Sequence, residues 1–274
     1  MSKPVLYTFE YSVWSAAPEL AIGELELTDA IEFKRVDLIQ GENFEPSFVK
    51  INPNATLPTI TADGKAYTNT TDVVDFLVKK SSVKVATRTA ITTAVHEEPV
   101  DPTFALFASR DDAELARVAG GFGGTVTNLR LAGLKKIAAT PEAQANKAFY
   151  DGKIATISEL SGLLAGTAPA EAKESFFKTS KAALEAVKVF YLETLPASIG
   201  EGPFIGGATP GEDDFHVTAW LAHIAFILGA GKTEDGLAAL EKGLAPPSEK
   251  VVNYWNAWSG RKGWAATYPG GNLH

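Results

Sequence analysis

Two serines near the start of the chain lie where a predicted strand gives way to a predicted helix, in the stretch EYSVWSAAPELA of residues 10–21. Residues 5–9 are typical of a strand, and apolar residues at helical spacing over 16–27 predict a helix. A serine at the start of a helix can cap the helix's own N–H groups, or it can stabilise a negative charge on a ligand beside the positive end of the helix dipole. Ser15, at the head of the predicted helix, and Ser12 are candidates for either role.

The pattern that follows predicts a small mixed sheet with helices. Its elements are a strand at 31–36, a short helix at 45–51, strands at 57–61 and 65–68 around the turn Asp63-Gly64, and a helix at 71–79. The order βαβ-α-ββα contains a βαβ unit, in which the two strands are parallel and the crossover is right-handed. We assign residues 1–82 to an N-terminal thioredoxin-like domain.

The rest of the chain predicts helices only. They are expected near residues 88–98, 102–119, 142–165, 171–195, 212–229, 234–243 and 248–258. The run GGFGG at 120–124 has no preceding strand and no following Lys-Ser/Thr, so it is interpreted as a flexible loop between helices and not as a phosphate loop. The predicted fold class is therefore α/β followed by all-α, with residues 83–274 as the helical domain.

Composition excludes several classes of function. The formal net charge of -8 disfavours binding to nucleic acid or to anionic membranes. The absence of cysteine excludes disulfides, thiolate metal sites and cysteine nucleophiles. The four histidines do not have the spacing of a metal motif, so no metal is expected. No signal peptide or membrane span is evident, and a cytoplasmic location is expected.

Three motifs together resemble those of soluble glutathione transferases. Residues 52–60 read NPNATLPTI, residues 67–77 read YTNTTDVVDFL, and residues 202–207 read GPFIGG before Asp213-Asp214-Phe215. They occur in the order and at the spacing of that family, over nearly the whole chain. The long helical part and the stretch around Ser15 are most similar to the fungal-specific class A, which is related to bacterial transferases that cleave lignin ethers.

The resemblance implies a binding site for glutathione. In the family a cis bond precedes the proline matched by Pro58, and the backbone of the preceding residue, here Leu57, pairs with the cysteinyl part of glutathione. Thr70 matches the serine that binds the γ-glutamyl carboxylate, whereas Asn69 replaces the usual glutamate. The implied glutathione-binding residues are Asn43, Thr56, Leu57, Pro58, Asn69 and Thr70. From the residues alone, a trans proline in an edge strand, a threonine helix cap and a surface turn at Asn43 remain open.

The resemblance also implies how the thiol is activated. A free thiol has a pKa of about 8.5, and a hydroxyl donor beside a helix N-terminus lowers it. Ser15 matches the family's serine, with Ser12 as the rival donor, and a plain N-cap is the structural alternative. The acceptor pocket is expected to include Tyr11, Trp14, Phe122, Arg130 and Trp220, although aromatic residues at helical spacing also form cores.

The function implied is that of a homodimeric glutathione transferase that conjugates or reduces hydrophobic, aromatic acceptors, as in detoxification. One alternative is a carrier that binds glutathione and hydrophobic metabolites without turnover. Another is a regulator with this fold, which an Asn/Gln-rich N-terminal extension would indicate, and none precedes the first strand in this sequence.

Overall fold

The structure, a computed structural model, describes residues 3–274. Its sheet has four strands in the order β2-β1-β3-β4. The strands are β1 (Val5–Thr8), β2 (Glu32–Arg35), β3 (Thr59–Ala62) and β4 (Lys65–Tyr67). β3 is antiparallel to both neighbours, with Leu6 opposite Ile60 and Ile60 opposite Tyr67. The turn between β3 and β4 has positive φ at Asp63 (49°) and Gly64 (78°), which confirms the predicted hairpin turn.

Three helices complete the thioredoxin-like part: α1 (Val13–Glu24), α2 (Pro46–Val49) and α3 (Thr70–Lys80). The element order is the predicted βαβαββα. Helix α1 begins three residues earlier than the apolar pattern indicates, because Ser12 and not Ala16 marks the change from extended to helical backbone. Pro18 is the sixth residue of α1, beyond the first turn, so the helix lacks the N–H that would otherwise donate to the carbonyl oxygen of Trp14.

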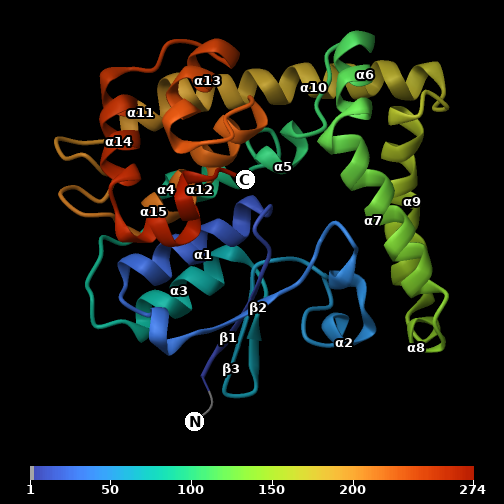
Figure 1. The fold of residues 1–274 in the computed structure, drawn as a ribbon, viewed down its shortest axis with the longest axis horizontal. Coiled ribbons are helices and arrows are strands. Elements are labelled where there is room, and N and C mark those ends of the chain that lie inside the picture. Colours follow the sequence, from blue (N-terminus) through green and yellow to red (C-terminus); the bar gives the residue numbers. More distant parts are fainter. Residues whose placement is uncertain (1–2) are drawn as a thin grey trace. The chain divides into compact units, whose positions relative to one another are not determined.

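The remainder of the described chain is helical, as predicted. Its helices are α4 (Ala90–Val95), α5 (Pro102–Ala105), α6 (Asp112–Gly120), α7 (Phe122–Ala138), α8 (Pro141–Gln144), α9 (Lys147–Leu164), α10 (Ala170–Val189), α11 (Leu195–Ser198), α12 (Glu212–Ile227), α13 (Gly236–Gly243), α14 (Glu249–Ser259) and α15 (Lys262–Thr267). The chain thus joins a thioredoxin-like N-terminal part to an all-helical C-terminal part (Figure 1). Among residues 3–274, no helix is both long and apolar enough to cross a membrane.

The predicted flexible loop at residues 120–124 is wrong. Gly121 forms the junction between α6 and α7, and the two glycines after Phe122 belong to the first turn of α7. A Cβ on Gly124 would lie 2.0 Å from the carbonyl oxygen of Ala119. The glycines therefore allow two helix ends to approach closely, a role that a pattern of helix breakers does not distinguish from a loop.

Packing divides the chain into two units. The first contains the chain up to Lys34, Leu57–Ala105 and Ala183–His274, and the second contains Arg35–Thr56 and Leu106–Ala182. The second unit has its own core, made by Phe44, Val49, Ala55, Leu134, Ile137, Ala143 and Tyr150. The predicted division at residue 82 follows the types of secondary structure, whereas these units follow side-chain contacts.

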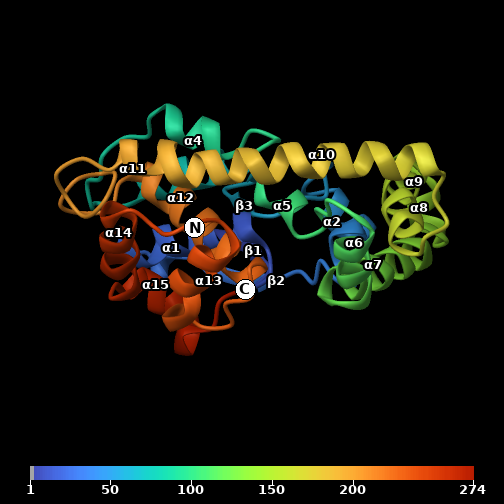
Figure 2. The same ribbon diagram turned by 90° about the horizontal axis from the view of Figure 1, so that it is seen from above.

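Helix α1 is the central element of the first unit. It packs against α3 and also against α12 and α15 from the C-terminal part (Figures 1 and 2). Helix α12 is buried along nearly its whole length, so it has no solvent-exposed face. The carboxylate of Asp214 in its first turn accepts hydrogen bonds from the backbone N–H groups of Ile205, Gly206 and Gly211, at 2.7–2.9 Å. These bonds join the GPFIGG segment to the aspartate that follows it in the third motif.

Candidate functional site

The strand register brings three of the predicted site segments to one end of the sheet. In the antiparallel pair of β1 and β3, Tyr7 lies opposite Thr59, so the end of β1 and the start of β3 are neighbours. Tyr67, the last residue of β4, lies one pair away, opposite Ile60. The segment after β1, the segment before β3 and the segment after β4 therefore meet at this edge of the sheet.

Two helices begin at the same edge. Ser12 is the N-cap of α1, and Asn69 is the N-cap of α3. The first N–H groups of each helix and the positive ends of both helix dipoles are therefore directed towards this edge of the sheet. A ligand that carries two separate negative charges would be stabilised there.

The side chain of Ser12 makes no capping hydrogen bond to its own helix. Its carbonyl oxygen accepts hydrogen bonds from the N–H groups of Ser15 (2.9 Å) and Ala16 (3.3 Å), so the backbone position of Ser12 is fixed. The residue is half-buried. Its hydroxyl is therefore held at the start of α1 and is not used by the cap, which leaves it available to a ligand.

Ser15 does not head the helix. It is the third helical residue of α1 and is 1% exposed, and its Oγ has no hydrogen-bond partner among the described residues. The expectation that Ser15 starts the helix is wrong because the Ala-Ala-Pro stretch after it resembles a helix start, whereas Val13 and Trp14 already have helical backbone. The N-cap alternative for Ser15 is wrong for the same reason.

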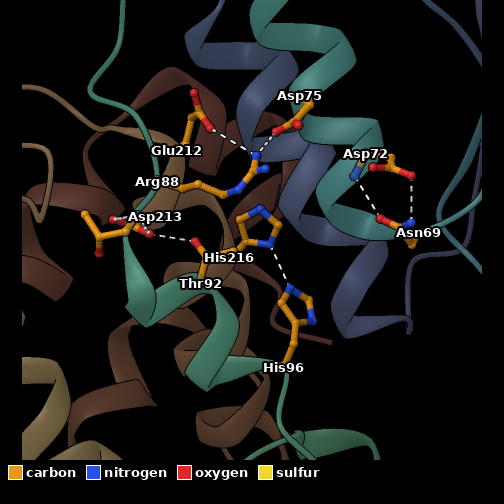
Figure 3. A network of polar contacts seen from close by, with 10 residues as sticks. Asn69, Asp72, Asp75, Arg88, Thr92, His96, Glu212, Asp213 and His216 are labelled. Atoms are coloured by element: carbon orange, nitrogen blue, oxygen red, sulfur yellow. Dashed lines mark hydrogen bonds and ion pairs between the residues drawn. The ribbon is translucent and has the colours of Figure 1, made fainter.

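Helix α3 is capped by Asn69 and not by Thr70. The Asn69 side chain accepts a hydrogen bond from the N–H of Asp72 and donates one to its carboxylate, both at 2.8 Å (Figure 3). Thr70 is the first helical residue and is 7% exposed. The threonine-cap alternative is therefore wrong. Because the Asn69 side chain is bonded to Asp72, it could contact the ammonium of a ligand only by giving up the hydrogen bond that caps α3.

The peptide bond between Leu57 and Pro58 is cis, as the family pattern predicts. Because the bond is cis, the trans alternative is excluded, and Pro58 directly precedes β3. The neighbouring Thr56 is exposed and belongs to the second unit, where Asn52 donates to its carbonyl oxygen (2.9 Å) and to its hydroxyl (3.1 Å). The amide of Asn52 thus fixes the backbone that leads into the cis bond.

Asn43 does not lie in a surface turn. It is fully buried in the second unit, where its amide donates to the carbonyl oxygen of Ala55 at 2.6 Å and accepts from Arg130 at 3.1 Å. Arg130 in α7 also donates to the carbonyl oxygen of Leu38, and it lies over the ring of Phe44. Burial lowers the pKa of Arg130 to about 10. Both side chains hold residues 35–56 against α7. The polar atoms of Asn43 are thereby enclosed, whereas Arg130 remains partly exposed.

The predicted acceptor residues have different environments. Trp220 is completely buried in α12 and its indole donates to the carbonyl oxygen of Val100 at 2.8 Å, so it is a core residue and the prediction of a pocket role is wrong. Tyr11 and Phe122 are 42% and 39% exposed and belong to different units. The Tyr11 ring contacts Phe226 and His274 at centroid distances of 6.3 and 6.0 Å.

Sequence reasoning missed the polar contacts around the first turn of α1. The Trp14 indole donates to Asp101 at 3.0 Å and lies 3.8 Å from the ring of His96, measured between centroids. His96 in turn is hydrogen bonded to His216 of α12 at 2.9 Å (Figure 3). These residues are 82 or more positions apart from Trp14, and no local pattern joins them.

Glu19 is a second group that the sequence did not single out. It lies in α1 and accepts a hydrogen bond from the Thr8 hydroxyl of β1. Burial raises the pKa of Glu19 from 4.5 to about 7, although the Thr8 bond acts in the opposite direction. Because the folded state binds this proton more tightly than the unfolded chain does, the free energy of unfolding should fall as pH rises from about 4.5 to about 7.

We expect Glu19→Gln to raise the free energy of unfolding by about 2 kcal/mol at pH 8 and to leave it nearly unchanged at pH 4.5. The glutamine keeps an acceptor for Thr8 but removes the buried charge. Urea unfolding at the two pH values measures the difference. A stabilisation of the same size at both pH values would show that the ionisation of Glu19 is not its cause.

Comparison with known proteins agrees with the fold and with the sheet-edge motifs. Residues 6–84 match the family of glutathione S-transferase N-terminal domains. No curated protein sequence matches the chain significantly. Because the matched segment is less than half of the chain, it identifies the N-terminal part only.

Solved glutathione transferases share the fold over nearly the whole chain. The beta-etherase LigF from Sphingobium sp. strain SYK-6 has a TM-score of 0.56 at 15% identity, covering 97% of this chain and 99% of that one. A glutathione transferase homologue from Sulfitobacter, solved with bound glutathione, has a TM-score of 0.54 at 16% identity, with 100% of both chains covered. Glutathione transferase Omega 3C from Trametes versicolor has a TM-score of 0.53 at 13% identity, with 97% and 89% covered. At these identities the similarity establishes the fold.

Proposed function

We propose that the protein is a glutathione transferase that activates the glutathione thiol with the hydroxyl of Ser12 and the N-terminus of α1. The observation that carries this proposal is the N-cap position of Ser12 with a hydroxyl that its own helix does not use. A donor and a helix dipole beside a sulfur atom both favour the thiolate. Ser15 is the less suitable donor because its Oγ is enclosed by the protein.

The same sheet edge offers partners for the rest of the tripeptide. The N-terminus of α3 at Thr70 suits the γ-glutamyl carboxylate, since free N–H groups and the helix dipole favour an anion there. The backbone of Leu57, directly before the cis bond and β3, suits strand-like pairing with the cysteinyl residue. With Asn69 in a cap and Asn43 buried, the ammonium and the glycyl carboxylate have fewer partners, so affinity should be modest.

The acceptor site that we propose includes Tyr11, which adjoins Ser12 in sequence and is exposed beside Phe226 and His274. Such a surface suits a hydrophobic, aromatic molecule. A place near the fungal-specific class A and the ether-cleaving transferases is part of the same proposal, supported by the motifs and the shared fold. Conjugation of an aryl halide and cleavage of an aryl ether are its two candidate reactions.

Calorimetry with glutathione and an assay with a model aryl halide test this function together. We expect glutathione to bind in the range of 10 μM to 1 mM and the aryl halide to be consumed in proportion to enzyme concentration. Binding without turnover of any aryl halide or ether would indicate the carrier instead. No binding at millimolar glutathione would refute both.

We also propose a homodimer, because an isologous pair is the commonest assembly of soluble proteins and the fold is that of glutathione transferases. Light scattering should give a mass of about twice 29.1 kDa at micromolar concentration. A mass of 29.1 kDa under those conditions would contradict the dimer.

A further inference from the structure

The first turn of α1 is tied to the helical part of its own unit by the side chain of Trp14. The indole N–H donates to Oδ2 of Asp101 at 3.0 Å. The other carboxylate oxygen of Asp101 accepts a hydrogen bond from the N–H of Thr103 at 2.8 Å. The backbone N–H of Asp101 donates to the carbonyl oxygen of Glu97 at 2.8 Å. The acceptor for the indole is thus itself fixed by two further bonds.

Besides its hydrogen bond to Asp101, the Trp14 side chain also contacts an imidazole ring. The Trp14 ring lies over His96 with an interplanar angle of 33°. Nε2 of His96 lies 2.9 Å from Nδ1 of His216. Figure 3 shows the contact between the two imidazoles. His216 is 1% exposed in α12. Trp14 is therefore held between a carboxylate and an imidazole that is anchored to a buried helix.

Both imidazoles are neutral near pH 7. Burial lowers the pKa of His96 to about 4, against the opposing effect of Asp101, and it lowers the pKa of His216 to about 3, together with His96 and Arg88. Two neutral imidazoles share a hydrogen bond with one donor and one acceptor, whereas two charged imidazoles present only donors. The link from Trp14 to α12 is thus complete at neutral pH.

Trp14 is also linked to Ser12 through the backbone. Ser15 and Ala16, which follow Trp14 directly, donate their N–H groups to the carbonyl oxygen of Ser12. A rotation of this first turn would therefore move the hydroxyl of Ser12. Hydrogen bonds weaken steeply with angle, and reacting groups must be held to about 0.5 Å, so a small rotation is enough to matter.

We propose that Trp14 is a positioning residue for Ser12, with Asp101 and the His96–His216 pair as its anchors. This inference rests on the proposed activation of the glutathione thiol by Ser12. It assigns the indole to the geometry of the first turn and not to the wall of the acceptor pocket. The tie explains why a large aromatic residue lies at the second position of a helix whose first turn carries the candidate donor.

A double-mutant cycle with Trp14→Phe and Asp101→Ala tests the proposal. The phenylalanine keeps a ring on His96 but loses the donor to Asp101. Each single change should raise the thiol pKa of bound glutathione by about half a unit, about a threefold loss of thiolate below the pKa, and the double variant should shift it no further. Trp255→Phe in α14, which removes an indole hydrogen bond to the carbonyl oxygen of Thr233, is the matched control for lost stability and should leave the thiol pKa unchanged.

Hydrogen exchange in the free protein provides the second measurement, which needs no ligand. The amides of Ser15 and Ala16 should exchange about tenfold faster in Trp14→Phe and Asp101→Ala than in Trp255→Phe. Unchanged exchange would show that Trp14 does not hold the turn. Faster exchange with an unchanged thiol pKa and a raised KM for the acceptor would place Trp14 in the pocket and overturn its positioning role. If the wild type binds no glutathione, the proposed function fails. The exchange rates then still show whether Trp14 holds the first turn of α1 in place.

Discussion

Replacing Ser12 with alanine is expected to raise the thiol pKa of bound glutathione by about one to two units and to lower turnover at pH 7 by about ten- to a hundredfold. The reason is that a hydrogen bond donated by the hydroxyl would stabilise the thiolate more than it stabilises the neutral thiol. Glutathione affinity should change by less than about threefold, because Leu57 and Thr70 would hold most of the tripeptide. The thiolate absorbance of the bound tripeptide against pH measures the shift.

Ser15→Ala is the matched comparison in the same helix. Since the Ser15 hydroxyl is buried without a partner, its removal should leave the thiol pKa unchanged and keep or slightly raise stability. Ser12→Thr, which keeps the hydroxyl, should restore most of the turnover. A shift of the thiol pKa in Ser15→Ala alone would reverse the assignment of the two serines.

Protonation of the buried histidines should destabilise the protein as pH falls below 6.5, against the smaller, opposite effect of Glu19. Burial lowers the pKa values of His96 and His223 to about 4 and that of His216 to about 3. The unfolded chain takes up these protons below its histidine pKa of about 6.5, whereas the folded state does so only near 3 to 4, so stability present above pH 6.5 is lost across that interval. The three groups together should remove on the order of 5 kcal/mol by pH 4.5.

Urea unfolding at several pH values between 7.5 and 4.5 checks this slope. His216→Gln should be less stable than the wild type at pH 7.5, because it disturbs the pair with His96, and the difference should shrink as pH falls. Glu19→Gln should steepen the acid slope, because protonation of Glu19 between about pH 7 and 4.5 stabilises the folded state and so opposes the loss from the histidines. In Glu19→Gln, which lacks the opposing effect of Glu19, a stability that stays level down to pH 4.5 would contradict the neutral, buried state of these histidines.

Much of the sheet could be predicted because its signals are local. The hairpin turn needs residues that accept positive φ, and Asp63-Gly64 provides them within two positions. The cis bond at Pro58 could be predicted only from the family motif, since a single Leu-Pro pair favours trans. The N-cap at Ser12 was missed because Val13 and Trp14 are weak helix formers, so the pattern placed the start of the helix later.

The errors at the site have long-range causes. Asn43 is buried by Arg130, which lies 87 residues further along the chain, and no local pattern indicates that pairing. Trp220 was expected near a ligand because the resemblance implies aromatic residues of the helical domain at the acceptor pocket, yet α12 is buried on all sides and Trp220 lies in the core. The contacts of Trp14 with Asp101 and His96 could not be predicted either, because these residues lie far apart in the sequence.

The second unit has a consequence for how the chain is made. Its first segment, Arg35–Thr56, is completed by partners that are translated much later, as when the hydroxyl of Tyr150 donates to the carbonyl oxygen of Phe44 across 106 residues. At a synthesis rate of about 5–20 residues per second, this segment waits on the order of 5–20 s on the ribosome before its core can close. During that interval Phe44 and Val49 have no partners from α7 or α9, and a chaperone that shields short apolar segments would act on this part of the nascent protein.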